Sequence, residues 1–225
     1  MKRIFNIALL LAAVLTVFAS CEENLDENTE YDDWQNRNAA YFSQVYAQAD
    51  EAIKAAQAQY GNSWEDHCPW RIIQTYAVPD TAKVEMTDNV VVYIQERGTG
   101  SGCPLYTDSA SVDYIGRLMP NALSEQEESR TKGYTFDHSG VSRDSADVFS
   151  PTLSTPVMFK VSAMVEGFTT VLMKMHIGDQ WRVYIPQELG YGSASTTDIP
   201  AYSTLIFDMR LRAYYRIGVI PGQKS

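Results

Sequence analysis

Apolar residues in segment 37–60 recur at every third or fourth position, which is the spacing of one face of an α-helix. Gly61 follows directly and provides a natural end to such a helix. The apolar stripe either packs on the protein's own domain or pairs two copies of the chain. We expect the first, because a single helix is weak grounds for a dimer. The stripe consists of Phe42, Val45, Tyr46, Ala49, Ile53 and Ala56.

From Trp70 onward the pattern changes to alternating or continuous apolar runs, which is typical of strands. One short helical segment, 168–175, interrupts them. These elements predict an α+β domain in which an antiparallel sheet wraps around one short helix. The polar segments 120–134 and 139–154 are expected to be surface insertions between strands. The predicted strands are 71–78, 90–95, 111–118, 158–165, 180–185 and 204–215.

The N-terminus has the pattern of a secretory signal. Lys2 and Arg3 precede an apolar stretch, 4–18, and small residues follow it. A single apolar run of this length, with these flanks, indicates a signal peptide over residues 1–20 rather than a permanent membrane span.

The cysteine that follows the signal segment suggests a lipid anchor. Phe18-Ala19-Ser20-Cys21 resembles a bacterial lipobox, although Phe18 stands where leucine is more common. The alternative is an ordinary signal-peptidase site with an incidental cysteine. We expect lipidation of Cys21, because several buried acyl carbons at about 0.8 kcal/mol each hold a protein stably on a membrane.

An acidic block follows Cys21: segment 22–33 holds seven carboxylates and no basic residue. Such a block is usually solvated, so we interpret residues 21–36 as a spacer. It also resembles the export signals of some lipoproteins from Bacteroides-like bacteria. We therefore expect an outer-membrane-anchored lipoprotein that faces the periplasm or the cell surface.

Charge and side-chain spacing exclude several classes of function. The formal net charge of -10 argues against nucleic-acid binding. His67, His138 and His176 are scattered and no CxxC motif occurs, so no metal site is expected. In an exported protein Cys68 and Cys103 could form a disulfide, although the sequence does not show whether they come close together.

The C-terminal two thirds of the chain carry an unusual series of short motifs. Gly190-Tyr191-Gly192 places an aromatic residue between two glycines, a loop whose backbone can bend closely around a ligand. Eight further motifs precede or follow it in a fixed order. They are Gly98-Thr99-Gly100, Val112-Asp113-Tyr114-Ile115-Gly116, Phe136-Asp137-His138-Ser139, Met164-Val165-Glu166-Gly167-Phe168, Met175-His176-Ile177-Gly178, Tyr184-Ile185-Pro186, Ile199-Pro200 and Leu205-Ile206-Phe207-Asp208-Met209-Arg210-Leu211.

This order closely resembles that of the FKBP-type peptidyl-prolyl cis-trans isomerases over residues 90–215. The resemblance implies an FKBP-like fold and a proline-binding pocket. Phe168 stands where the family often has tryptophan, and Val157 where it often has another aromatic residue. Phe159 is expected to face the same interior. The implied pocket residues are Tyr114, Phe136, Asp137, Val157, Met164, Val165, Phe168, Tyr191, Ile199 and Phe207.

The resemblance also implies roles for these residues, with Tyr114, Phe136, Asp137, Tyr191 and Phe207 as the catalytic set. Phe136, Phe168 and Phe207 would grip the proline ring of a polypeptide client. The Tyr191 hydroxyl and the Val165 N–H would hold neighbouring carbonyls, and Asp137 would accept a hydrogen bond from Tyr114 or interact with the twisting amide. No cofactor is implied.

Three other functions compete with an isomerase. The domain could bind proline-containing segments without catalysis, or the acidic N-terminus and helix could dock the protein into a membrane-surface complex. The third, a hydrolase built on Asp137-His138-Ser139, conflicts with geometry, because three consecutive residues do not normally point at one another. The expected organisation is a signal peptide at 1–20, a lipidated spacer at 21–36, a helical segment at 37–66, an isomerase domain at 67–216 and a tail at 217–225.

Overall fold

The structure is a computed structural model, and it describes residues 29–79, 82–140 and 155–218. The expected signal peptide, the lipidated Cys21 and the first half of the acidic spacer lie outside these residues, as does most of the 139–154 insertion. No helix within the described part of the chain has the length and apolar character needed to cross a membrane.

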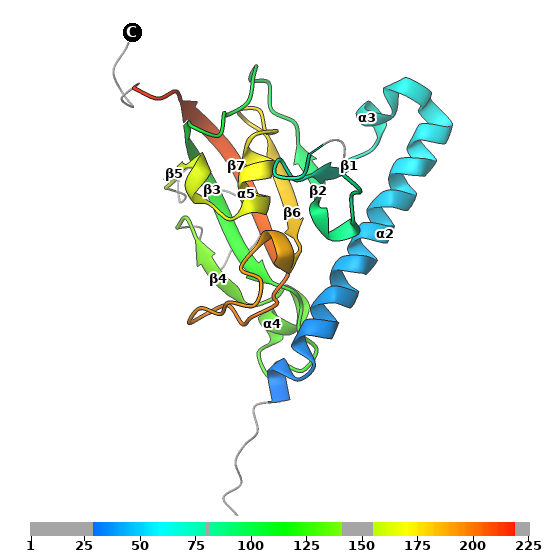
Figure 1. The fold of residues 1–225 in the computed structure, drawn as a ribbon, viewed down its shortest axis with the longest axis vertical. Coiled ribbons are helices and arrows are strands. Elements are labelled where there is room, and N and C mark those ends of the chain that lie inside the picture. Colours follow the sequence, from blue (N-terminus) through cyan, green and yellow to red (C-terminus); the bar gives the residue numbers. More distant parts are fainter. Residues whose placement is uncertain (1–28, 80–81, 141–154, 219–225) are drawn as a thin grey trace, which may run out of the picture.

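The predicted N-terminal helix is present as α2 (Trp34–Tyr60), and Gly61 follows its end. It begins three residues before the predicted start, so that Trp34 becomes its first residue. Phe42, Val45 and Ala49 are buried against Val91. The apolar stripe therefore packs on the protein's own sheet, alongside β1 (Trp70–Gln74) and β2 (Asn89–Glu96), as Figure 1 shows.

The sheet has seven antiparallel strands, which confirms the expected α+β class. Their order is β1-β2-β6-β7-β3-β4, and β5 pairs with a separate part of β3. The remaining strands are β3 (Ser109–Leu118), β4 (Thr135–His138), β5 (Val157–Lys160), β6 (Gln180–Ile185) and β7 (Leu205–Tyr215).

Helix α5 (Glu166–Leu172) covers the face of the sheet opposite to α2. Val90 and Val92 pack into the core beneath α5, whereas Val91 packs beneath α2. This alternation follows from the two-residue repeat of a strand. Gly167 lets α5 approach the sheet closely, because a Cβ there would lie 2.4 Å from a methyl carbon of Ile185.

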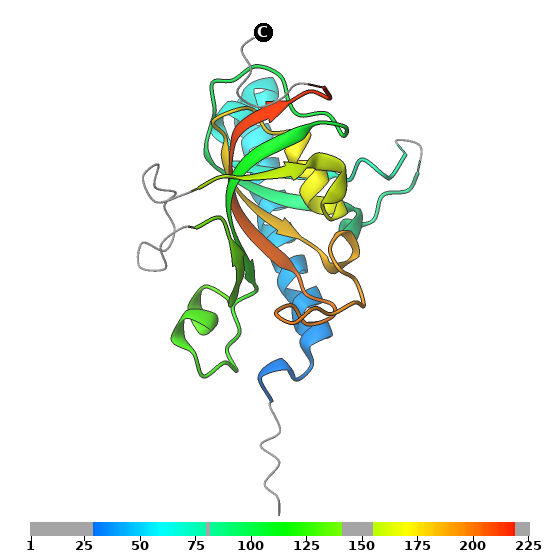
Figure 2. The same ribbon diagram turned by 90° about the vertical axis from the view of Figure 1, so that its left-hand side faces the viewer.

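Short helices fill several connections within the described residues (Figures 1 and 2). They are η1 (Thr29–Tyr31), η2 (Gly61–Ser63), α3 (Trp64–His67), η3 (Met86–Asp88), α4 (Glu127–Thr131), η5 (Val161–Ala163) and η6 (Gln187–Leu189). The predicted surface insertion 120–134 contains α4, so it is partly helical rather than an irregular loop.

Several predicted boundaries were wrong for local reasons. The strand predicted over 158–165 ends at Lys160, because Val161 turns inward: it is fully buried, and its N–H donates to the Asp108 carbonyl. The next residues form η5, and the Thr169 hydroxyl donates to the Val161 carbonyl at 2.7 Å. The first predicted strand, 71–78, ends at Gln74, after which Thr75 bonds to the Glu166 carboxylate at 2.5 Å.

Cys68 and Cys103 are free thiols, so the suggested disulfide between them is absent. Cys68 is buried just after α3. The Cys103 sulfur lies instead 3.8 Å from Nε2 of His176. The sequence could not show that Cys68 and Cys103 stay unpaired, because spacing along the chain does not fix where two side chains point.

Candidate active site

Five aromatic side chains from β3, β4, β5, α5 and β7 form one continuous cluster on the α5 side of the sheet. Phe207 is central: its ring centroid lies 5.0 Å from Phe168 and 5.6 Å from Phe136, both in edge-to-face geometry. Tyr114 lies 5.4 Å from Phe159, which in turn lies 5.8 Å from Phe168. Edge-to-face contacts at these distances are favourable, so the rings hold one another in place.

Gly116 makes room for this cluster. It lies on β3 between Phe207 of β7 and Asp137 of β4. A Cβ at this position would lie 2.6 Å from two ring carbons of Phe136 and 2.8 Å from one of Phe207. Only glycine therefore allows both rings to lie over this part of the strand.

Tyr114 carries the polar group of the cluster. Its hydroxyl donates a hydrogen bond of 2.7 Å to Oδ2 of exposed Asp137, while its ring is buried. Burial, the hydrogen bond to Asp137 and the charge of that carboxylate all raise the pKa of Tyr114. The phenol therefore stays protonated at neutral pH and keeps its donor role.

Ser139 fixes the backbone on both sides of this contact. Its hydroxyl accepts the Tyr114 N–H at 2.9 Å, and its own N–H donates to the Tyr114 carbonyl at 3.0 Å. Asp137 is held as well, because its Oδ1 accepts the His138 N–H at 2.8 Å. The sequence showed Ser139 as part of a motif, but its contact with β3 depends on the pairing of two strands.

Tyr191 lies on a loop beside the cluster, and 43% of its side chain is exposed. The loop is built from tight turns: Gly192 has a φ of 59°, and its N–H donates to the Gln187 carbonyl at 2.9 Å. Ile199, further along the same connection, is buried in the main core. The loop thus has a fixed base and presents an accessible phenol.

Comparison with known proteins identifies the origin of this arrangement. Residues 104–212 match the family model described as FKBP-type peptidyl-prolyl cis-trans isomerase. Over these residues the chain is therefore similar to the FKBP family. The matched residues include every residue of the aromatic cluster and the Tyr191 loop. Strands β1 and β2 precede the matched residues, yet they are hydrogen-bonded into the same sheet.

Individual relatives agree with this assignment. The chain is 30% identical over 139 residues to the macrophage infectivity potentiator of Trypanosoma cruzi, covering 61% of this chain and 58% of that protein. It is also 30% identical over 136 residues to the FKBP-type 22 kDa peptidyl-prolyl cis-trans isomerase of Escherichia coli, covering 59% and 55%. The chain therefore spans little more than half the length of these relatives.

Among solved structures, a peptidyl-prolyl cis-trans isomerase from Pseudomonas syringae is similar to this chain with a TM-score of 0.44. The sequence identity is 19%, and the match covers 77% of this chain and 96% of that one.

Not every predicted pocket residue lies in the ring cluster. Met164 and Val165 are half-buried against the core next to α5. Val157, by contrast, is 36% exposed and pairs with Val112 at the edge formed by β5.

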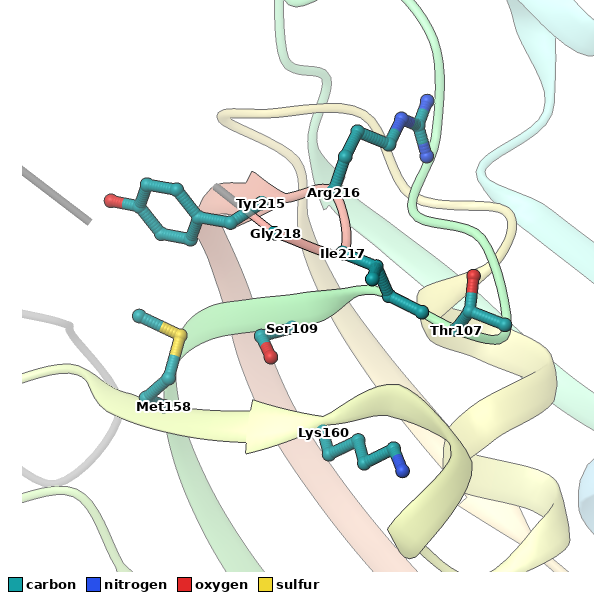
Figure 3. A pocket seen from close by; sticks show the side chains of 8 residues that line it. All are labelled: Thr107, Ser109, Met158, Lys160, Tyr215, Arg216, Ile217 and Gly218. Carbon is teal, nitrogen blue, oxygen red and sulfur yellow. The ribbon is translucent and has the colours of Figure 1, made fainter. Parts of the chain in front are cut away.

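Two hollows lie outside the ring cluster. A cavity of about 410 Å³, shown in Figure 3, lies where the end of β7 meets β3 and β5, and Met158 and Lys160 line it. A larger groove of about 1520 Å³ runs along β1 and α2. Neither includes any of the five clustered rings, so the candidate site rests on the cluster itself and on the family match.

Cys103, His176 and Asp179 form a row that superficially resembles a nucleophilic triad. His176 Nδ1 lies 3.5 Å from Asp179, but Asp179 also accepts the backbone N–H groups of Gly98 and His176 at 2.7 and 2.6 Å. Burial, followed by the charge of Asp179, raises the pKa of the Cys103 thiol. A raised thiol pKa lowers the fraction of reactive thiolate, so the row shows no sign of an activated nucleophile.

Proposed function

We propose that this protein is a peptidyl-prolyl cis-trans isomerase that accelerates rotation about Xaa-Pro bonds in exported polypeptides. The observation that carries the proposal is the hydrogen-bonded pair of Tyr114 and Asp137 at the edge of the five-ring cluster, inside an FKBP-type domain. A scaffold that only needed a packed core would gain nothing from a phenol and a carboxylate at that position.

The reaction needs a change of environment rather than a nucleophile. The barrier to rotation is about 18–20 kcal/mol and arises from amide resonance. In the twisted transition state conjugation is lost, and the amide becomes less polar. A dry aromatic site disfavours the planar, polar amide more than the twisted one, and each 1.36 kcal/mol of that difference is about a tenfold gain in rate.

The clustered rings provide such a site. In this proposal Phe136, Phe168 and Phe207 grip the proline ring, and burial of Phe168 and Phe207 keeps the floor free of water. Tyr114 forms a wall that Asp137 orders through the 2.7 Å hydrogen bond. The edge-to-face packing fixes the rings before the client arrives, so little ordering is left for the moment of binding.

Polar groups at the rim orient the client chain. The exposed Tyr191 hydroxyl and the Val165 N–H would donate to carbonyls on either side of the Xaa-Pro bond. Val157 lies at the outer edge and would contact residues that flank the proline. Ile199 closes the site beneath the loop.

Exchange NMR on a short peptide, Ala-Leu-Pro-Phe, tests the activity. The chain should raise the cis-trans exchange rate at substoichiometric concentration, and Tyr191→Phe should reduce that rate while the protein stays folded. A chain that binds the peptide, as shown by shifted peptide signals, but leaves its exchange rate unchanged would be a binding module instead.

We also propose that lipidation of Cys21 anchors the protein at the outer membrane. The support is the lipobox-like sequence Phe18-Ala19-Ser20-Cys21 after an apolar signal segment. Cells that express the wild type should incorporate a labelled fatty acid into the protein and retain it in the membrane fraction. Cys21→Ser should remove both, and label that persists in Cys21→Ser would refute the anchor.

A further inference from the structure

The first turns of α2 reach across the molecule to the loop that carries Tyr191 (Figures 1 and 2). The indole Nε1–H of Trp34 donates to the Ser203 hydroxyl at 2.9 Å, and Trp34 is buried in the main core. One turn later, Oδ1 of Asn38 accepts the Thr204 N–H at 2.7 Å. Each contact joins residues more than 160 positions apart in the sequence.

Asn38 is hydrogen-bonded through both the nitrogen and the oxygen of its side-chain amide, although it is only 1% exposed. Its Nδ2 donates to the Trp34 carbonyl at 2.8 Å. The backbone carbonyl of Asn38 accepts the Thr204 hydroxyl at 3.3 Å. A buried amide is costly unless it is hydrogen-bonded, so these bonds fix the position of Thr204 relative to α2.

The anchored turn is connected directly to Tyr191. The Ser203 hydroxyl donates to the Pro200 carbonyl at 2.6 Å, which closes the turn. Tyr202, within it, has a φ of 63°, a left-handed conformation that a tyrosine holds only where its surroundings enforce it. The Tyr202 N–H then donates at 2.7 Å to the carbonyl of Gly192, the residue next to Tyr191.

We infer that Trp34 and Asn38 are positioning residues of the isomerase site. They hold the strained 200–204 turn, and the turn holds the backbone beside Tyr191 through the bond between Tyr202 and Gly192. The inference rests on the proposed function. It extends the site beyond the residues 104–212 that match the family, to a helix that lies outside them.

The first test does not depend on activity. Trp34→Phe keeps an aromatic ring and removes the N–H, and Asn38→Ala removes the acceptor for Thr204. In the full chain, purified in detergent, amide hydrogen exchange at Tyr202 should become about tenfold faster in each variant, because its bond to Gly192 is less well held. Val45→Ala is the matched control: it creates a cavity on the same helix away from the loop, and exchange at Tyr202 should stay within about twofold of wild type.

The second test measures whether the contact made by Trp34 affects the role of Tyr191 in catalysis. Trp34→Phe should lower kcat/KM for Ala-Leu-Pro-Phe by about fivefold, as expected for the loss of one hydrogen bond at a site it helps to hold. Tyr191→Phe should then cost less in the Trp34→Phe background than in wild type, because the phenol is already displaced. Val45→Ala should leave kcat/KM unchanged, so a general loss of stability cannot produce this pattern.

The outcomes separate the inference from the proposed function. If the wild type does not accelerate peptide exchange, the isomerase proposal fails, and hydrogen exchange at Tyr202 still decides whether α2 positions the loop. If the wild type is active but Tyr202 is equally protected in Trp34→Phe, Asn38→Ala and wild type, the inference is wrong. Strictly additive effects of Trp34→Phe and Tyr191→Phe on kcat/KM would also overturn it.

Discussion

The hydroxyl of Tyr114 lies 2.7 Å from Oδ2 of Asp137, so a phenol on the central strand β3 is tied to a carboxylate on the short strand β4. The contact joins a buried wall of the ring cluster to its exposed rim. It gives β4 a fixed position over β3, and Phe136, the residue before Asp137, is thereby held against Phe207.

The raised pKa of Tyr114 predicts a pH dependence of stability. A folded-state pKa above the ordinary value of 10.0 means that the folded protein holds this proton more tightly than the unfolded chain. The stabilisation is therefore complete below that value and is lost as pH rises through the folded-state pKa. Urea unfolding between about pH 9 and 11 should show a steeper loss of stability in wild type than in Tyr114→Phe. Parallel curves would contradict this origin.

Gly116→Ala should disturb the ring cluster. The added methyl group would meet the rings of Phe136 and Phe207, and overpacking of this kind costs about 1–3 kcal/mol. Chemical denaturation measures the loss of stability, and near-ultraviolet circular dichroism should report altered aromatic packing. Gly61→Ala is the control for the change of residue type: Gly61 has a φ of 56°, so alanine strains the backbone there, but a Cβ meets nothing within 4 Å, and the aromatic signal should not change. An unchanged aromatic signal in Gly116→Ala would show that the rings are not confined as described.

Asp208→Ala should be strongly destabilising. The buried Asp208 carboxylate accepts bonds from Arg117 at 3.0 Å and from Arg182 at 2.7 and 2.8 Å. Removing one member of a buried ionic group typically costs about 3–5 kcal/mol, because buried charge is left uncompensated. Urea unfolding checks this value.

The control for Asp208 is Glu96→Ala, which removes the exposed partner of Arg210 and should cost under about 1 kcal/mol.

Asp208 follows Phe207 in β7, so its side chain lies on the opposite face of the sheet from the rings. The folded fraction of Asp208→Ala should therefore keep its peptide exchange activity. A loss of stability in Asp208→Ala as small as that in Glu96→Ala would mean that water reaches the ion pairs of Asp208 with Arg117 and Arg182.

Phe42→Ala tests whether α2 is an integral part of the domain. Phe42 is 2% exposed and packs with Val91, so its truncation should destabilise the whole protein by about 3–5 kcal/mol in one cooperative transition. Gln44→Ala, on the exposed side of the same helix, should change stability by less than about 0.5 kcal/mol. A separate, low-stability transition for α2 would show that the helix does not depend on the sheet.

The spacing of apolar residues along short segments of the chain predicted most of the secondary structure. The three-to-four-residue repeat located α2, and the alternation in 180–185 matched β6 residue for residue. The same repeat could not show which surface the helix covers, because an apolar stripe fits a sheet and a second helix equally well. The repeat also could not predict buried polar contacts. Nothing in the sequence distinguishes Asn38, which is buried against Thr204, from the exposed polar residues around it.

The sequence indicated the side chains of the candidate site but not the backbone contacts that support them. Ordered motifs indicated Tyr114, Phe136, Phe168 and Phe207, and all four lie in one cluster. The backbone that supports them was missed, since Tyr202 and Ser203 act through turn geometry and long-range bonds rather than through residue type. The motif order also indicated Val157, which lies at the exposed edge of the sheet, and its role in binding a client stays a prediction.

The most direct test of the account is exchange NMR on Ala-Leu-Pro-Phe with wild type and the double variant Phe136→Ala/Asp137→Ala. Both proteins should first give dispersed spectra of a folded domain. The account predicts that wild type accelerates cis-trans exchange and that the double variant loses at least about a hundredfold in kcat/KM, a change of roughly 2.7 kcal/mol in transition-state stabilisation. A folded double variant as active as wild type would contradict the assignment of the site, and an inactive, folded wild type would contradict the isomerase itself.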